Sequence, residues 1–196
     1  MVTSWQVTPA TPAARAVLDA AGRLFYERGI NVVGVETLAA EAGVTKKTLY
    51  DRFGSKSALV AAYLTERDHH FRGWVERSIG THSGVDRPLA VFDALDSWMD
   101  AHSPNGCAFV HAYGELLGSP DHPAHDVIRE EKRWLRQRFT ELLRELGAHS
   151  PPELAMQLVV LLEGAKVVRS ITEEPGAIAQ ARRAARVLLL EGLGEM

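Results

Sequence analysis

Residues 35–56 read VETLAAEAGVTKKTLYDRFGSK, and this stretch predicts two short helices joined by a tight turn. Small apolar residues recur through its first part, and Gly43 then supplies the backbone conformation that ends a helix without a steric penalty. Thr45 is a good N-cap for the second helix. Leu49 is placed to anchor that helix from one side. The stretch is therefore predicted to be a helix-turn-helix.

The second of these helices carries side chains that suit a DNA backbone. Lysine ammonium groups and the hydroxyls of Thr and Tyr bind phosphate oxygens, and lysine also reaches the N7 and O6 acceptors of guanine. On a generic short helix, such lysines would form a solvated face and the tyrosine would pack, but a helix-turn-helix docks through this element. The residues expected to contact DNA are Thr37, Thr45, Lys46, Lys47, Thr48, Tyr50, Arg52 and Lys56.

The spacing A-x-x-x-G-V-T-x-x-T-L-Y-x-x-F, which begins at Ala39 and is followed by S-K, resembles the DNA-binding domain of the TetR family of transcriptional regulators. The resemblance extends upstream through residues 13–29. It implies that Tyr50 and Lys56 clamp the DNA backbone while residues 45–48 face the major groove or its edges.

The same resemblance implies a mode of action for the whole chain. Such regulators typically associate as homodimers through their two C-terminal helices, and a two-fold dimer reads two half-sites of double-stranded DNA. We therefore expect a regulator, in the first instance a repressor, that binds a near-palindromic operator and is released by a small-molecule effector.

Charge is unevenly distributed along the 196 residues. The net charge of −3 does not by itself indicate a nucleic-acid partner, but residues 13–60 hold seven Lys/Arg against five Asp/Glu, and the remainder is acidic. This asymmetry fits a DNA-binding domain at residues 11–55 and a helical domain for effector binding and dimerisation at residues 56–196.

Composition also indicates where the protein works. The single cysteine, Cys107, excludes an internal disulfide and agrees with a reducing compartment. The N-terminus shows no secretory signal, and no run of about 18 apolar residues predicts a membrane span. We expect a cytoplasmic protein that makes no membrane contact.

Apolar residues recur at helical spacing along the chain, and no segment shows the alternation of a strand. The expected fold is all-α, with a three-helix DNA-binding domain followed by a helical body, about nine helices in all. Caps, glycines and prolines place the helices near residues 12–29, 35–42, 46–52, 56–79, 86–101, 107–117, 124–146, 152–172 and 176–192.

The last two predicted helices have more apolar surface than one stripe requires. Val159 and Val160 widen the apolar face of the first, and both helices carry small residues that allow close approach: Gly164, Ala165, Ala184 and Ala185. This favours a helix-on-helix interface between two copies of the chain. The alternative is that both faces serve the core of a single copy.

Aromatic and other apolar residues of the body are candidates for an effector pocket, although aromatics at helical spacing are more often ordinary core. If a pocket exists, they favour an apolar or aromatic effector. The candidates are Trp74, Phe92, Trp98, Met99, Phe109, Tyr113, Trp134 and Leu161.

Other functions fit parts of the sequence less well. Cys107 and His111 lie one helical turn apart, with His122 and His125 nearby in sequence, which suggests a metal or redox sensor, but a buried thiol and solvated histidines explain them more simply. A helical enzyme and an effector-independent DNA-binding protein are the remaining alternatives. Because no phosphate-binding loop, nucleophile elbow or HExxH motif is present, we expect no enzymatic activity, cofactor or metal.

Overall fold

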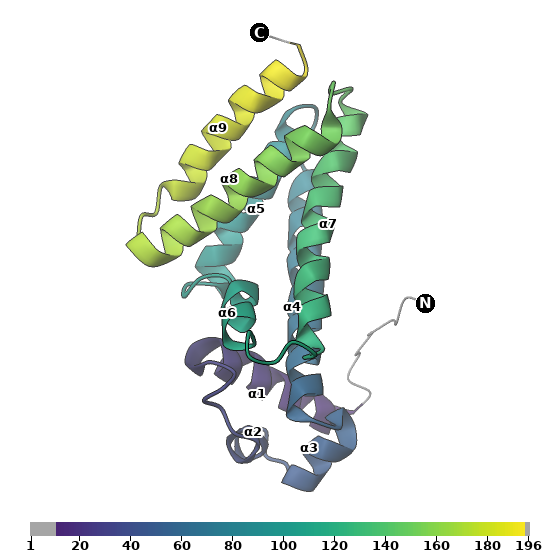
Figure 1. Cartoon of the computed structure of the whole chain (residues 1–196), viewed down its shortest axis with the longest axis vertical. Helices are drawn as coiled ribbons and strands as arrows, with labels where there is room; N and C mark the ends of the chain where they lie inside the picture. Colours follow the sequence, from purple (N-terminus) through teal and green to yellow (C-terminus); the bar gives the residue numbers. More distant parts are fainter. Residues whose placement is uncertain (1–10, 195–196) are drawn as a thin grey trace. The chain divides into compact units, whose positions relative to one another are not determined.

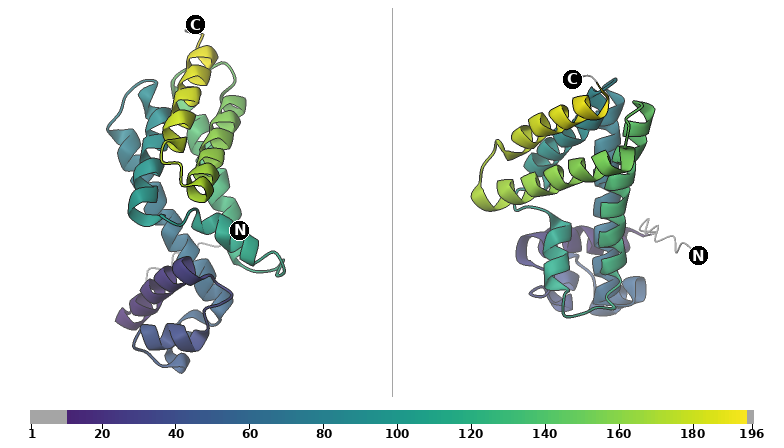
Figure 2. Two further views of the ribbon diagram at one scale, coloured as in Figure 1. Left: turned by 90° about the vertical axis from the view of Figure 1, so that its left-hand side faces the viewer. Right: turned by 45° about the horizontal axis from the view of Figure 1, so that its top comes forward.

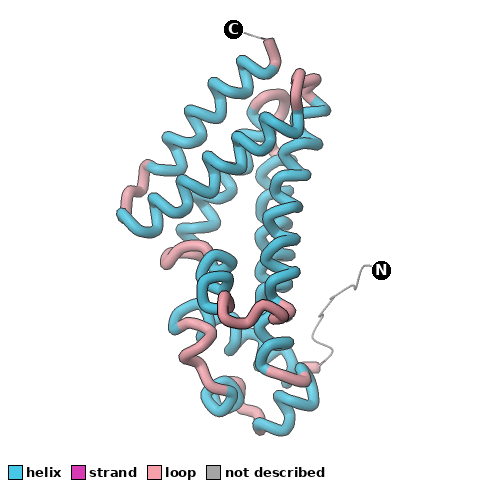
Figure 3. The backbone as a smooth tube through the Cα atoms, viewed as in Figure 1, coloured by secondary structure: helices cyan, strands magenta, loops and turns pink. Residues whose placement is uncertain are grey.

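The structure is a computed structural model that describes residues 11–194. In that part of the chain it contains nine α-helices and no strand (Figures 1 and 3), which confirms the predicted all-α fold. The helices are α1 (Pro12–Arg28), α2 (Val35–Glu41), α3 (Lys46–Phe53), α4 (Lys56–Gly80), α5 (Asp86–His102), α6 (Ala108–Glu115), α7 (Ala124–Glu145), α8 (Pro151–Thr172) and α9 (Ala177–Gly192).

The described chain divides into two compact units. The first contains residues 11–70 together with 108–130, and the second contains residues 71–107 together with those from 131 onward. Helices α4 and α7 therefore contribute to both units. These two units are defined by how the chain packs. The boundary between the functional domains, expected near residue 55, stays a prediction.

In the first unit, α1 packs against both α2 and α3, which also contact each other. The residues that fill the space between them are fully buried, among them Leu24, Leu38 and Leu49. Helix α1 begins as expected: the Thr11 hydroxyl accepts a hydrogen bond from Ala14 N at 3.2 Å, and Pro12 occupies the first turn, where its missing N–H costs nothing. A three-helix unit is thus built around one small apolar core.

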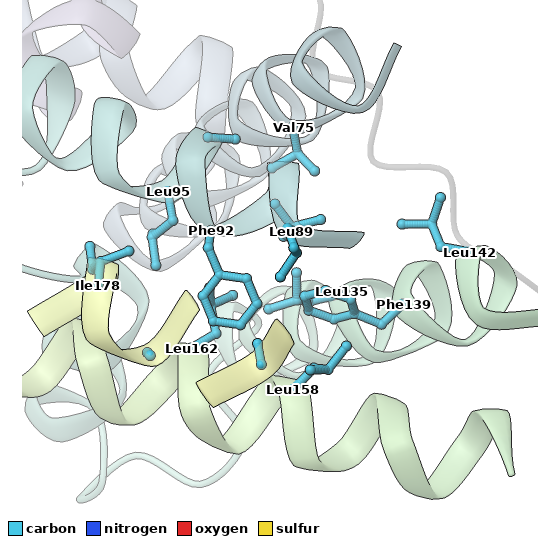
Figure 4. Packing of buried hydrophobic residues seen from close by; sticks show 14 of the residues in the cluster. Val75, Leu89, Phe92, Leu95, Leu135, Phe139, Leu142, Leu158, Leu162 and Ile178 are labelled. Carbon is cyan, nitrogen blue, oxygen red and sulfur yellow. The ribbon is translucent and has the colours of Figure 1, made fainter. Parts of the chain in front are cut away.

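In the second unit, the core lies among α5, α7, α8 and α9, with the C-terminal part of α4 (Figure 4). The rings of Phe92 and Phe139, 6.1 Å apart, occupy its centre. Helix α9 packs along both α8 and α5, and the views of Figure 2 show α8 and α9 running side by side. Ala165 and Ala185 are buried in this core, because α8 and α9 use them to approach their neighbours within one copy. Their assignment to an interface between copies was wrong.

Candidate functional site

The turn between α2 and α3 is built from local backbone geometry. Gly43 has a φ of 64°, the left-handed conformation that costs glycine nothing. Around it, Gly43 N donates to Ala40 O at 3.1 Å and Val44 N donates to Ala39 O at 2.9 Å, which satisfies the last carbonyls of α2. This arrangement ends α2 and turns the chain directly into the next helix.

Helix α3 is capped at its start and anchored from one side. The Thr45 hydroxyl accepts a hydrogen bond from Thr48 N at 3.1 Å, as an N-cap should. Leu49 is the buried residue of this helix, and Phe53 is half-buried. Gly54, with a φ of 74°, ends the helix. A short helix held by one buried leucine leaves its remaining faces in solvent.

The exposed part of α3 and its N-cap carries five of the eight residues expected to contact DNA. Tyr50 is 41% exposed, and Arg52 and Thr45 are also exposed. Lys46 pairs with Glu36, and Lys47 pairs with Asp51 at 2.7 Å. Both ion pairs lie in solvent, where such pairs contribute little. The two ammonium groups can therefore exchange a carboxylate for a phosphate at small cost.

The contact between Glu36 and Lys46 joins the start of α2 to the start of α3. Thr37, which follows Glu36 in α2, is exposed. Thr48 is half-buried, and its hydroxyl lies 2.9 Å from that of Thr45. The structure thus gathers the sequence-predicted residues of α2 and α3 on connected elements, with Thr48 less accessible than its neighbours.

Lys56, at the start of α4, has a different environment. It is half-buried, and this burial lowers the pKa of its ammonium group, while the nearby Glu115 carboxylate opposes the change. Lys56 and Thr48 are the two expected DNA contacts that are half-buried.

Sequence reasoning missed the role of Glu115, at the end of α6. Its carboxylate accepts hydrogen bonds from Ile30 N at 2.9 Å and Asn31 N at 2.8 Å, while Asn31 Nδ2 donates to the Glu115 carbonyl at 2.9 Å. Gly29, with a φ of 92°, leaves room for that carboxylate, since a Cβ there would lie 3.1 Å from it. Helix α6 thereby holds the connection between α1 and α2. No signal in the sequence pairs residues about 85 positions apart.

The residues expected to line an effector pocket fall into both units. In the second unit, Phe92, Trp98 and Met99 are buried core residues. Trp74 is half-buried, its ring 5.8 Å from that of Trp98 and its indole N–H bonded to Ser97 Oγ.

The other four candidates have separate surroundings. Trp134 is half-buried with the Arg72 guanidinium over its ring at 4.9 Å. In the first unit, Phe109 is buried and Tyr113 is exposed. Among the eight candidates, Leu161 lines an open hollow of about 530 Å³ between α8 and α9, and the other seven do not line it.

The cysteine and histidines of the sensor hypothesis also fall into different units. Cys107 is a half-buried free thiol of the second unit, whereas His111, His122 and His125 belong to the first. His125 is buried, with Nε2 at 3.1 Å from Ser119 O. Residues 11–194 contain no group of three or more His, Cys, Asp or Glu side chains that could hold a metal ion.

No helix within residues 11–194 is long and apolar enough to cross a membrane. Glu115 and Glu163 make separate contacts: the first with backbone amides, the second with lysines of its own unit.

Comparison with known proteins places this geometry among bacterial regulators. A family model described as "Bacterial regulatory proteins, tetR family" matches residues 17–63. The crystal structure of SCO4454, a TetR-family transcriptional regulator from Streptomyces coelicolor, is similar with a TM-score of 0.83 and 29% identity, covering 93% of this chain and 96% of that one. The sav143 protein of Streptomyces avermitilis, described as a tetR-type transcriptional regulator, is 31% identical with a TM-score of 0.73, covering 89% and 98% of the two chains.

A relative known as a repressor is also similar in sequence. The HTH-type transcriptional repressor KstR2 of Mycolicibacterium smegmatis is 26% identical over 157 residues, which cover 78% of this chain and 75% of the repressor. These relatives are transcriptional regulators, and they favour a regulator over the enzyme alternative.

Proposed function

This chain belongs to the TetR family of bacterial transcriptional regulators, which bind DNA, and on that premise we propose that it is a repressor whose homodimer binds a near-palindromic operator and releases it when a small molecule binds the body. DNA binding, dimerisation and effector release each depend on a different part of the molecule.

The observation that carries DNA binding is the exposed, anchored helix α3. Leu49 fixes it to the protein, while Lys46, Lys47 and Tyr50 remain in solvent. Because the lysines now meet only exposed carboxylates, phosphate groups can replace those partners. We assign Lys46 and Lys47 to the groove and its edges and Tyr50 to the DNA backbone.

Dimerisation is supported by an apolar stripe on α8. Met156, Val160, Val167 and Ile171 follow one another at spacings of four and seven residues, so they share a face of the helix, and all four are exposed. Val160 is 62% exposed and Ile171 is 76% exposed. On α9, Val187 is exposed as well. A contiguous apolar face of this kind typically marks a protein interface.

Release by an effector requires a ligand that binds one conformation of the dimer more tightly than the other. Helix α6 belongs to the first unit, where Glu115 holds the α1–α2 connection, and it follows α5 of the body along the chain. Helix α6 is thus the element through which we expect the effector state to reach the DNA-binding helices.

The first experiment is a selection of bound duplexes from random DNA at controlled salt. Wild-type protein should enrich a near-palindrome. Lys46→Ala combined with Tyr50→Phe should weaken binding to it, whereas Arg144→Ala, which removes an exposed cation from α7, should not. The homodimer carries two copies of Lys46, so if both meet phosphates at the edge of the groove, their removal should also reduce the dependence of log affinity on log salt by about 1.8, which is about 0.9 for each cation. Failure of the wild type to enrich any sequence at any salt concentration would refute the function.

Dimerisation is tested by Val160→Glu. The side chain is exposed in one copy, so the substitution leaves the fold intact but places a charge in the proposed interface. Sedimentation should show a monomer for this variant and a dimer for the wild type. A variant that remains a dimer would exclude the α8 stripe as the interface.

A further inference from the structure

An ion pair joins the two helices of the helix-turn-helix where each of them begins. Glu36 lies in the first turn of α2, and its carboxylate contacts the ammonium group of Lys46, the first residue of α3. Both side chains are in solvent, with 72% of the Glu36 side chain and 51% of the Lys46 side chain exposed. The carboxylate therefore lies beside the ammonium group that we assign to the groove of DNA and its edges.

The other two carboxylates of α2 and α3 have partners elsewhere. Glu41, at the end of α2, pairs with Arg23 of α1, and Asp51, in the second half of α3, pairs with Lys47 one turn earlier. In helix-turn-helix proteins, the N-terminal residues of the second helix contact base edges. Because Glu36 contacts the first residue of α3, its carboxylate lies at the end of the helix that approaches the bases.

Both groups of this pair are charged at neutral pH. Lys46 lowers the pKa of the Glu36 carboxyl through a hydrogen bond, and the backbone N–H of Glu36 lowers it further. In turn, the Glu36 carboxylate raises the pKa of Lys46. The chain therefore presents to DNA a carboxylate, which only accepts hydrogen bonds, next to an ammonium group, which only donates them. Exposed ion pairs contribute little to stability, so the two groups can separate at small cost.

A carboxylate at the major groove has few favourable partners. Phosphate groups repel it, and N7 and O6 of guanine and O4 of thymine are acceptors like itself. Adenine presents N6 as a donor beside N7 as an acceptor, a pattern that suits an amide. The match for a carboxylate is the N4 amine of cytosine, which only donates, and an ammonium group matches the guanine to which that cytosine is paired. A carboxylate and an ammonium group side by side thus fit the two bases of one G·C pair.

We propose that Glu36 is a specificity-determining residue, whose carboxylate accepts a hydrogen bond from the N4 amine of one cytosine in each half-site of the operator. On DNA that lacks this amine, the carboxylate meets only acceptors and phosphates, so binding there is weaker. The proposal rests on the proposed function, because Glu36 can read a base only if α3 enters the major groove. It adds an acidic residue to the expected DNA contacts.

The test compares affinities for chemically modified DNA. In the operator selected above, each cytosine of the half-sites is replaced in turn by pyrimidin-2-one, a base that lacks the N4 amine and leaves guanine in the opposite strand. At one position, this replacement should weaken binding of the wild type about 5-fold for each half-site replaced, beyond its effect on Glu36→Ala. The comparison with Glu36→Ala removes the cost of the altered base pair, because that cost is common to both proteins.

A matched variant controls for the loss of charge. Glu27→Ala removes an exposed carboxylate from α1 and should show the same loss as the wild type. Glu36 is exposed and alanine favours helices, so Glu36→Ala should unfold at nearly the wild-type temperature. The proposal is overturned if no cytosine position distinguishes Glu36→Ala from the wild type. Glu36 would then form a surface ion pair alone.

A second variant changes the base that is read. Glu36→Gln replaces the carboxylate by an amide, which suits N6 and N7 of adenine. In the selection from random DNA, the position that depends on cytosine in the wild type should become enriched in adenine, and an unchanged base preference would contradict the reading of cytosine.

The same selection separates this proposal from the proposed function. If the wild type enriches no duplex, the proposed function is refuted together with the role of Glu36. An operator that the wild type enriches and that both Glu36 variants read in the same way would leave the proposed function standing and overturn the role of Glu36 alone.

Discussion

Glu115→Ala should destabilise the first unit, because the carboxylate of Glu115 holds the connection between α1 and α2. The substitution removes the acceptor of two backbone N–H groups, those of Ile30 and Asn31, at 2.9 and 2.8 Å. A hydrogen bond to a charged group contributes about 1.5–3 kcal/mol when it is shielded from water. Because Asn31 is exposed and water can replace its partner, we expect a loss of about 2–3 kcal/mol for both bonds together.

Two assays measure that loss. Urea unfolding gives the change in free energy, and hydrogen exchange of the slowest amides of α1, which do not contact Glu115, gives the local opening of the unit. A loss of 2–3 kcal/mol corresponds to exchange that is roughly 30- to 150-fold faster. Glu115→Gln, which keeps one acceptor oxygen, should lose about half as much.

The matched control is Glu27→Ala, which removes an exposed carboxylate from α1. It should change stability by less than about 0.5 kcal/mol, as surface substitutions normally do. A similarly small effect of Glu115→Ala would contradict the inference that α6 holds the α1–α2 connection. The route proposed from the effector to DNA would then need another element.

Three further perturbations test the helix-turn-helix and the ion pairs that Glu163 makes with Lys132 and Lys166. Gly43→Ala should lower the free energy of unfolding by about 1–2 kcal/mol, measured by thermal unfolding. The φ of Gly43 is 64° and no atom lies within 4 Å of an added Cβ, so the cost comes from the backbone conformation and not from a clash. Gly43→Asn should lower the free energy of unfolding by less, and equal losses for the two variants would contradict this reason. Leu49→Ala should lower the free energy of unfolding by about 2–5 kcal/mol. It should also weaken DNA binding, although Leu49 is fully buried and cannot touch DNA itself. Normal operator affinity in a gel-shift assay would contradict the role of Leu49 as the anchor of α3. The pKa of Glu163 in the folded protein lies below its ordinary value, so near that pKa the folded protein binds fewer protons than the unfolded chain. The ion pairs of Glu163 therefore contribute to stability above about pH 4.5. This contribution is lost as the pH falls through the folded-state pKa. Glu163→Gln should therefore flatten the fall in unfolding free energy as the pH is lowered below about 4.5, and an unchanged slope would exclude the contribution.

The amino-acid sequence determined the helices and the helix-turn-helix closely. The ends of α2 and α3 depend on Gly43, Thr45 and Gly54, whose effects are local: a positive φ or a side chain that bonds an amide three residues away. The same local rules predicted helices at residues 86–101 and 46–52, and the structure extends each by one residue. Family resemblance in the sequence was likewise confirmed, because its motif lies within a contiguous stretch.

Contacts between distant segments were decided only by the tertiary structure. In the sequence, a lysine such as Lys166 in an amphipathic helix is expected to lie in solvent. In the structure it pairs with Glu163, and Lys132, which lies 31 residues before Glu163 in another helix, reaches the same carboxylate. The same holds for Glu115, whose partners lie in another part of the chain, and for Ala165, which faces the core of one copy. Helical periodicity determines which residues share a face, but the free energy of burying a charge depends on what packs against that face.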